Sequence, residues 1–105
     1  MIDIVVYVKD TEYTGLKVSG HANFGEEGRD IVCAAVSVLT INLANSVERF
    51  CDDDFTVDSD DGFFHFTLSD RSEKSGVLLD SCILGLMDIG EKYSDYININ
   101  LQEVK

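Results

Sequence analysis

Cys33 and His21 are the residues of this 105-residue chain whose types and spacing best suit nucleophilic chemistry. Cys33 lies near the predicted start of a helix, where unpaired backbone N–H groups and the positive end of the helix dipole favour an anion. Thiols in such positions ionise below their usual pKa of about 8.5, particularly beside an imidazolium. An imidazole within hydrogen-bond reach takes the thiol proton and later delivers a proton to a leaving amine. The pair therefore predicts acyl transfer by a cysteine nucleophile.

Two neighbouring residues, Asp30 and Ser37, have both a structural and a catalytic interpretation. Asp30 suits the N-cap of the helix, and its carboxylate can also orient His21. Ser37 lies one turn after Cys33, where its hydroxyl either hydrogen-bonds near the nucleophile or bonds back to its own helix. A cysteine in an apolar helix is more often a buried core residue than a nucleophile, so spacing alone leaves these alternatives open.

Hydrophobic periodicity predicts the elements that position the pair. Apolar residues alternate over residues 2–8 and 16–18, which indicates a strand hairpin that ends just before His21. From residue 32 to residue 50 apolar residues recur every three or four positions, which indicates a core-facing helix capped by Asp30. No charged residue lies between Ile31 and Asn45, so we expect this helix to be covered on more than one side.

The second half of the chain repeats the hairpin-then-helix order. Residues 55–57 and 64–68 alternate around a turn at Asp61-Gly62, and Asp70 with Glu73 suggests the capped start of a helix that runs to Tyr93. A last strand is predicted over residues 96–101. The order ββαββαβ predicts one α+β domain over residues 1–105, in two layers, with two main helices on a mainly antiparallel sheet of about five strands. Periodicity does not define the strand order.

Charge and composition exclude several classes of protein. Asp and Glu number 20 against 8 Lys and Arg, for a formal charge of −12, and such a surface repels phosphate backbones, so direct nucleic-acid binding is not expected. We find neither a signal peptide nor an apolar segment of the roughly 20 residues that cross a bilayer, so we expect no membrane partner and a cytoplasmic location. The spacing of three Cys and two His matches no metal motif, and no metal or other cofactor is predicted.

The sequence around the pair resembles the ribosomal-processing cysteine protease Prp family. The resemblance lies in Gly20-His21-Ala22 and in the run GRDIVCAAVS from Gly28 to Ser37, and the likeness in length and element order extends over essentially the whole chain. By this resemblance His21 and Cys33 are the catalytic pair.

The resemblance also implies further site residues, a substrate and an oligomeric state. Asp30 and Ser37 fall on the family's other site-lining positions, and a loop that includes Asn23, Phe24, Gly25 and Gly28 covers bound peptide, with Phe24 as a contact for an aromatic side chain near the cut. The implied activity is that of a bacterial endopeptidase that removes the N-terminal extension of a large-subunit ribosomal protein. Members of the family are homodimers, and an acidic surface suits a basic ribosomal client.

One alternative belongs to a different functional class. In it the chain is a non-enzymatic dimeric binding module or chaperone for a basic ribosomal protein, and Cys33 is a buried core thiol. The reactivity of Cys33 and the fate of the client distinguish the two interpretations.

Overall fold

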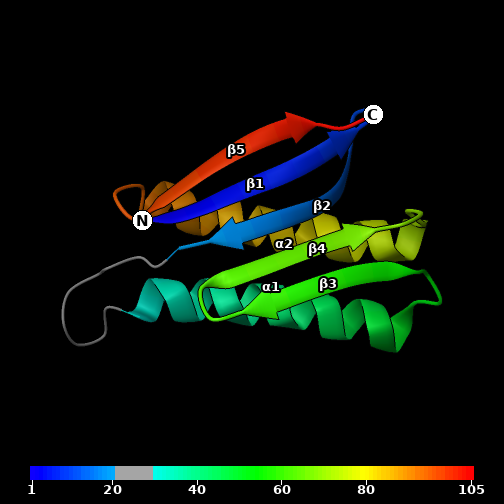
Figure 1. Ribbon diagram of the computed structural model, residues 1–105, viewed down its shortest axis with the longest axis horizontal. Coiled ribbons are helices and arrows are strands. Elements are labelled where there is room, and N and C mark those ends of the chain that lie inside the picture. The colour runs from blue at the N-terminus through cyan, green and yellow to red at the C-terminus, as the bar shows by residue number, and fades with distance from the viewer. Residues whose placement is uncertain (21–29) are drawn as a thin grey trace.

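A computed structural model describes residues 1–20 and 30–105, which form a five-stranded sheet and two helices (Figure 1). In chain order the elements are β1 (Ile2–Lys9), β2 (Glu12–Ser19), α1 (Asp30–Phe50), β3 (Phe55–Asp60), β4 (Phe63–Leu68), α2 (Glu73–Lys92) and β5 (Ile97–Glu103). The predicted order ββαββαβ and the α+β class are confirmed.

The strand order is β3-β4-β2-β1-β5. Neighbouring strands are antiparallel except β1 and β5, which are parallel, so the sheet is mixed but mainly antiparallel, as predicted. Because β4 pairs with β2, the second hairpin lies directly beside the first. In this register Val18 lies opposite Phe64 and Ser19 opposite Phe63, so the β3–β4 turn lies beside the end of β2.

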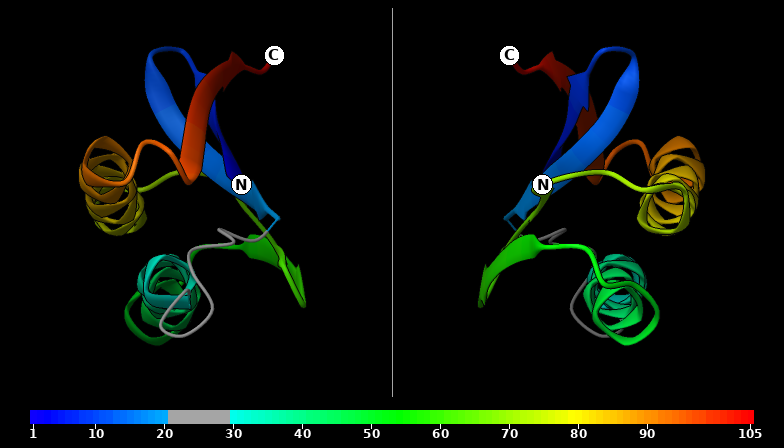
Figure 2. Two further views of the ribbon diagram at one scale, coloured as in Figure 1. Left: turned by 90° about the vertical axis from the view of Figure 1, so that its left-hand side faces the viewer. Right: turned by 90° about the vertical axis from the view of Figure 1, so that its right-hand side faces the viewer.

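Both helices cover the same face of the sheet, with α1 towards β3 and β4 and α2 towards β2, β1 and β5 (Figure 2). The core lies between these layers. It contains the alternate residues of the strands and the apolar stripes of the helices that the periodicity predicted, among them Ile4, Leu16, Val36, Phe66 and Leu86.

The start of α2 differs from the prediction. Its N-cap is Ser72, not Asp70: the Ser72 hydroxyl accepts a hydrogen bond from the Ser75 backbone N–H, and the Ser75 hydroxyl accepts one from the Ser72 N–H. The Ser72 hydroxyl also donates to the Asp53 carboxylate at 2.5 Å. The capping box is therefore formed by two serines, Ser72 and Ser75. Asp70 and Glu73 have the spacing of a capping box but do not form it.

Arg71 ties the start of α2 to the first hairpin. Its guanidinium donates two hydrogen bonds to the Asp80 carboxylate, at 2.8 and 2.7 Å, and a third to the Tyr13 carbonyl at 3.0 Å. Glu12 lies 3.3 Å away on the same strand as Tyr13. The bidentate geometry makes this a directional contact between helix and sheet rather than a diffuse surface attraction.

Helix α1 has the predicted length but is more apolar along that length than the sequence analysis allowed. Residues Ile31–Phe50 are the one described segment that has the length and hydropathy of a membrane span, so the prediction that no segment approaches this length was wrong. In the fold α1 is a core helix: Val32, Val36, Leu43 and Val47 are buried. A core helix meets the same criteria of length and composition, which explains the apolar run.

Candidate active site

A cleft of about 600 Å³ lies between the first half of α1 and one end of the sheet. One wall is α1, the floor comes from β1, β2 and β4, and the opposite wall is the β3–β4 turn. The described lining residues are Cys33, Val36, Ser37, Thr40 and Ile41 of α1, together with Ile2, Val18, Gly20 and residues 59–64.

Cys33 is the fourth residue of α1, because the helix includes Asp30 and does not begin after it. It was predicted as the third residue, and the difference leaves it in the first turn, where the helix dipole favours an anion. Its side chain is half-buried and packs against the core on one side while it lines the cleft on the other. Cys33 is therefore held by the hydrophobic core and reachable from the cleft.

Gly20 fixes the end of β2 at the cleft. Its backbone has a φ of +93°, which side chains other than glycine strongly disfavour, and a Cβ there would collide with the Met1 carbonyl. The Gly20 N–H donates to the Gly62 carbonyl at 2.9 Å. The last described residue before His21 therefore lines the same cleft as Cys33.

Ser37 lies on the cleft wall one turn after Cys33, as the sequence predicted. The alternative interpretation was that the Ser37 hydroxyl bonds back to its own helix. In the structure Thr40 makes such a bond: its buried hydroxyl donates to the Val36 carbonyl at 3.0 Å. Within the described residues the Ser37 hydroxyl makes no hydrogen bond, and the side chain is exposed. The Ser37 hydroxyl is thus available to a molecule in the cleft.

Several predicted site residues lie outside the described residues. They are His21 and the proposed covering-loop positions Asn23, Phe24, Gly25 and Gly28; of Asp30, only its place as the first residue of α1 is described. The structure thus brings together Cys33 and Ser37 at the cleft, and the roles of His21 and Asp30 stay predictions.

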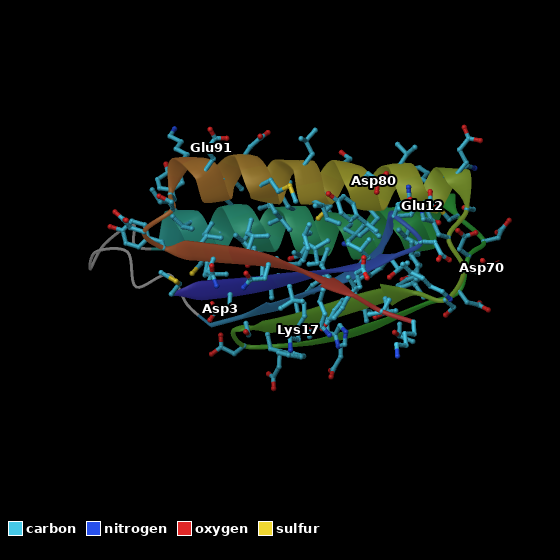
Figure 3. The ribbon with its side chains drawn as sticks, turned by 90° about the horizontal axis from the view of Figure 1, so that it is seen from above. Asp3, Glu12, Lys17, Asp70, Asp80 and Glu91 are labelled. Atoms are coloured by element: carbon cyan, nitrogen blue, oxygen red, sulfur yellow. The ribbon has the colours of Figure 1, made fainter. Side chains whose placement is uncertain are left out.

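The second histidine, His65, faces away from the cleft. It lies opposite Lys17 and Asp58 in the sheet and contacts the rings of Tyr7 and Phe63, at 5.8 and 6.4 Å between centroids. Lys17 projects from the sheet face opposite the helices (Figure 3). Since residues paired across strands share a face, His65 lies on that open face and does not serve Cys33.

The other cysteines differ from Cys33 in their surroundings. Cys82 lies buried in α2 with its thiol donating to the Leu39 carbonyl at 3.5 Å, and burial raises the pKa of Cys82 to about 12. Cys51 follows α1 directly, and its pKa is raised by partial burial and then by the Asp53 carboxylate. Both environments disfavour a thiolate.

No group of three or more His, Cys, Asp or Glu within residues 1–20 and 30–105 is arranged to hold a metal ion. On the α1 wall of the described cleft, the groups that could act chemically are the Cys33 thiol and the Ser37 hydroxyl. These groups suit acyl transfer better than ligand exchange at a metal.

Sequence reasoning missed one wall of the cleft. Ser59, Asp60 and Asp61 were interpreted only as part of a hairpin, and no local signal relates them to Cys33. They reach the cleft because β4 pairs with β2, a contact between segments about 45 residues apart that periodicity does not reveal.

A half-buried cysteine in the first turn of a core helix, open to a peptide-sized cleft, defines a candidate cysteine hydrolase on an α+β scaffold. The comparisons with known proteins agree with this class. The family model described as cysteine protease Prp matches residues 1–98, and the chain belongs to this family. The ribosomal processing cysteine protease Prp of Staphylococcus aureus strain Mu50 is 30% identical over 104 residues, which cover 95% of this chain and 98% of that protein.

Solved structures give the same relationship. The crystal structure of an essential ribosomal processing protease Prp from S. aureus with a covalently linked product peptide superposes with a TM-score of 0.89 at 29% identity, covering 97% of this chain and all of that one. A second S. aureus structure, with a substrate peptide, has a TM-score of 0.87 at 28% identity and covers the same shares. The protein is therefore a cysteine peptidase of the Prp family.

The environment of Cys82 predicts a pH dependence of stability. The ordinary thiol pKa is about 8.5, and in the folded chain burial raises the pKa of Cys82 to about 12. The folded chain thus keeps a proton that the unfolded chain loses, and the corresponding stability is complete below about pH 8.5 and disappears as the pH rises towards 12. Between these values the unfolding free energy of the wild type should fall faster than that of Cys82→Ala, by up to about 1.4 kcal/mol per pH unit. Urea unfolding at each pH measures this, and parallel pH profiles would contradict it.

Proposed function

We propose that the protein is a cysteine endopeptidase that removes the N-terminal extension of a large-subunit ribosomal protein. The observation that carries the proposal is the place of Cys33, in the first turn of α1 and on the wall of a cleft of about 600 Å³. Membership of the Prp family and the peptides bound to the S. aureus relatives support a peptide as occupant of this cleft.

In the proposed reaction the Cys33 sulfur attacks the carbonyl carbon of the scissile peptide bond. His21 takes the thiol proton and delivers it to the leaving amine as the C–N bond breaks and a thioester forms. Water then attacks the thioester carbon, His21 accepts a proton from that water, and the thiol leaves. Free N–H groups at the start of α1 stabilise the oxyanion of each tetrahedral intermediate.

The remaining predicted site residues take supporting roles in this proposal. Asp30 orients the His21 imidazole or caps α1, and Ser37 hydrogen-bonds to peptide in the cleft, which its exposed hydroxyl allows. The segment with Asn23, Phe24, Gly25 and Gly28 covers the substrate.

The identity of the client as a large-subunit protein rests on the family resemblance and on charge. The chain carries a formal charge of −12, and ribosomal proteins are basic because they bind RNA phosphates. Opposite net charges raise the rate of encounter. We also propose a cytoplasmic location, where such a client is made; recovery of the protein in a membrane fraction would contradict it.

We further propose that the protein is a homodimer that buries the outer face of α1. Ile31 and Val38 are 49% and 66% exposed, and the helix carries no charge from Ile31 to Asn45. An apolar, uncharged helix face of this length is typical of surfaces that pair with another chain.

Cleavage of a client tests the function. An N-terminally extended large-subunit ribosomal protein is mixed with the wild type or with Cys33→Ala, and the products are weighed by mass spectrometry. We expect the wild type to release one defined N-terminal peptide and the variant to lose at least about 1,000-fold in rate, because it lacks the nucleophile. Equal cleavage by both would contradict the mechanism. Binding of the client without cleavage would favour the non-enzymatic module.

Alkylation tests the role of His21. At pH 7 iodoacetamide should modify Cys33 several-fold faster than Cys51 or Cys82, whose surroundings raise their thiol pKa values. His21→Ala should slow modification of Cys33 and leave the other two rates unchanged, because only Cys33 shares a proton with His21 in the proposal. The rates are followed by mass spectrometry of tryptic peptides. An unchanged Cys33 rate in His21→Ala would exclude the pair.

Sedimentation velocity tests the dimer. Val38→Asp should convert a dimer to monomer, because it places a charge in the proposed apolar interface. Leu84→Asp on α2 is the matched control, since Leu84 is 63% exposed against 66% for Val38 and lies on the other helix. Equal sedimentation of the wild type and Val38→Asp would contradict this interface.

A further inference from the structure

We propose that the free edge of β3 binds the substrate segment next to the cut as an additional strand, with the backbone of Ser59 as the contact at the cleft. This inference rests on the proposed function, because it assumes that peptide occupies the cleft beside Cys33. It goes further in that it assigns the binding of this peptide to main-chain groups of the sheet.

Strand β3 lies at one edge of the sheet (Figure 1). It pairs with β4 on one side, and on its other side the described part of the chain provides no strand. Five of its six residues are exposed. An unpaired edge presents a row of free backbone N–H and C=O groups, to which an extended peptide can add as a further strand.

A hydrogen bond at the start of β3 shows which of its backbone groups face this edge. The Ser69 N–H donates to the Asp54 carbonyl at 3.0 Å, so the adjacent partners Phe55 and Leu68 form a non-hydrogen-bonded pair. The N–H and C=O of Phe55 therefore point away from β4. The register continues along β3 without a shift, and the same orientation recurs at every second residue. The residues whose backbone groups face the free edge are Phe55, Val57 and Ser59.

The other end of β3 leads to the same assignment. The loop between β3 and β4 has two residues, so the residues that flank it, Asp60 and Phe63, are a hydrogen-bonded pair. The bond from the Gly20 N–H to the Gly62 carbonyl agrees with this, because it leaves the backbone groups of Phe63 directed towards β3 and not towards β2. Ser59 precedes Asp60, and its N–H and C=O thus point away from β4.

Ser59 connects the free edge to the cleft. It lines the same cleft as Cys33, whereas Phe55 and Val57 do not line it. In the register Ser59 lies opposite the buried Phe64, so its side chain lies on the helix side of the sheet. A peptide with its scissile bond at Cys33 can therefore reach the free N–H and C=O of Ser59 and continue along the edge towards Val57.

Charge favours the substrate over a second copy of the chain as the strand that is added. Asp58 and Asp60 lie on β3, and charged residues on an edge strand oppose the pairing of two identical edges. The same charges attract a segment of a basic client. The opposite edge of the sheet, β5, carries no charge from Ile97 to Gln102 and contributes no residue to the cleft. Of the two edges, β3 thus has both the location and the charge for the substrate.

An added strand makes a specific prediction about the peptide. Every second residue of the bound segment directs its N–H and C=O towards β3, and the residues between direct theirs away. One hydrogen bond contributes a net factor of roughly 2 to 12 in affinity. Methylation of an amide nitrogen that donates to β3 should therefore weaken binding by at least about 2-fold, and methylation of its neighbours should not.

The test uses peptides that span the cut of the client, each with one N-methylated amide at successive positions outside the scissile bond. The kcat/KM of the wild type and the Kd of Cys33→Ala, from fluorescence anisotropy, are measured for each peptide. We expect losses at every second position on one side of the cut. Losses without this period of two, or no losses, would overturn the inference.

Ser59→Pro tests the protein side of the contact. Proline removes the N–H that faces the free edge, and it is tolerated on edge strands at such positions because the ladder to the neighbouring strand is kept. The Kd for the unmethylated peptide should rise by roughly 2- to 12-fold, with little change in the melting temperature. If Ser59→Pro does not fold, the series of methylated peptides decides alone.

Leu101→Pro on β5 is the matched control. The Val104 N–H donates to the Val8 carbonyl, so by alternation along this parallel pair the Leu101 N–H points away from β1, towards the other free edge. Leu101 is 60% exposed, and Leu101→Pro should leave the Kd for the peptide unchanged. Equal losses in Leu101→Pro and Ser59→Pro would contradict a specific role of β3.

Two further outcomes separate this inference from its alternatives. If Ser59→Pro converts a dimer to monomer in sedimentation velocity and leaves the Kd for the peptide unchanged, a second copy occupies the edge and the inference is wrong. Absence of cleavage by the wild type would instead contradict the proposed function. The Kd values of Cys33→Ala for the methylated peptides would then still decide whether β3 binds peptide as a strand.

Discussion

The pairing of β2 with β4 is the contact on which the site depends. It places Ser19 opposite Phe63 and so brings the end of the first hairpin against the turn of the second. The hydrogen bond from Gly20 to Gly62 extends that ladder by one step, at a φ of +93° that a residue with a side chain would adopt only with strain. Without this pairing the β3–β4 turn would not lie opposite α1, and Cys33 would lie on an open helix end rather than in a cleft.

Cys82 and Cys33 show how one fold places two thiols in different surroundings. Cys82 lies inside the layer between helices and sheet, where burial raises its pKa to about 12. Cys33 lies on a helix of similar apolar character, but in the first turn and at the boundary between core and cleft. The same hydrophobic packing that makes Cys82 inert thus holds Cys33 in place while it leaves one side open. The two cysteines differ more in their position along a helix than in the type of residue around them.

Local patterns in the sequence predict the elements, and contacts between distant segments decide what they build. Alternation in the strand segments and the apolar stripes of the two helices were sufficient for the order ββαββαβ, because each pattern reflects burial of one face of one element. The cap of α2 could not be read in this way: Asp70 and Ser72 are both good capping residues, and Asp53, from a distant segment, hydrogen-bonds to Ser72. For the same reason Cys33 and Ser37 could be predicted as cleft residues from one helix, while the place of the β3–β4 turn beside them required the strand order.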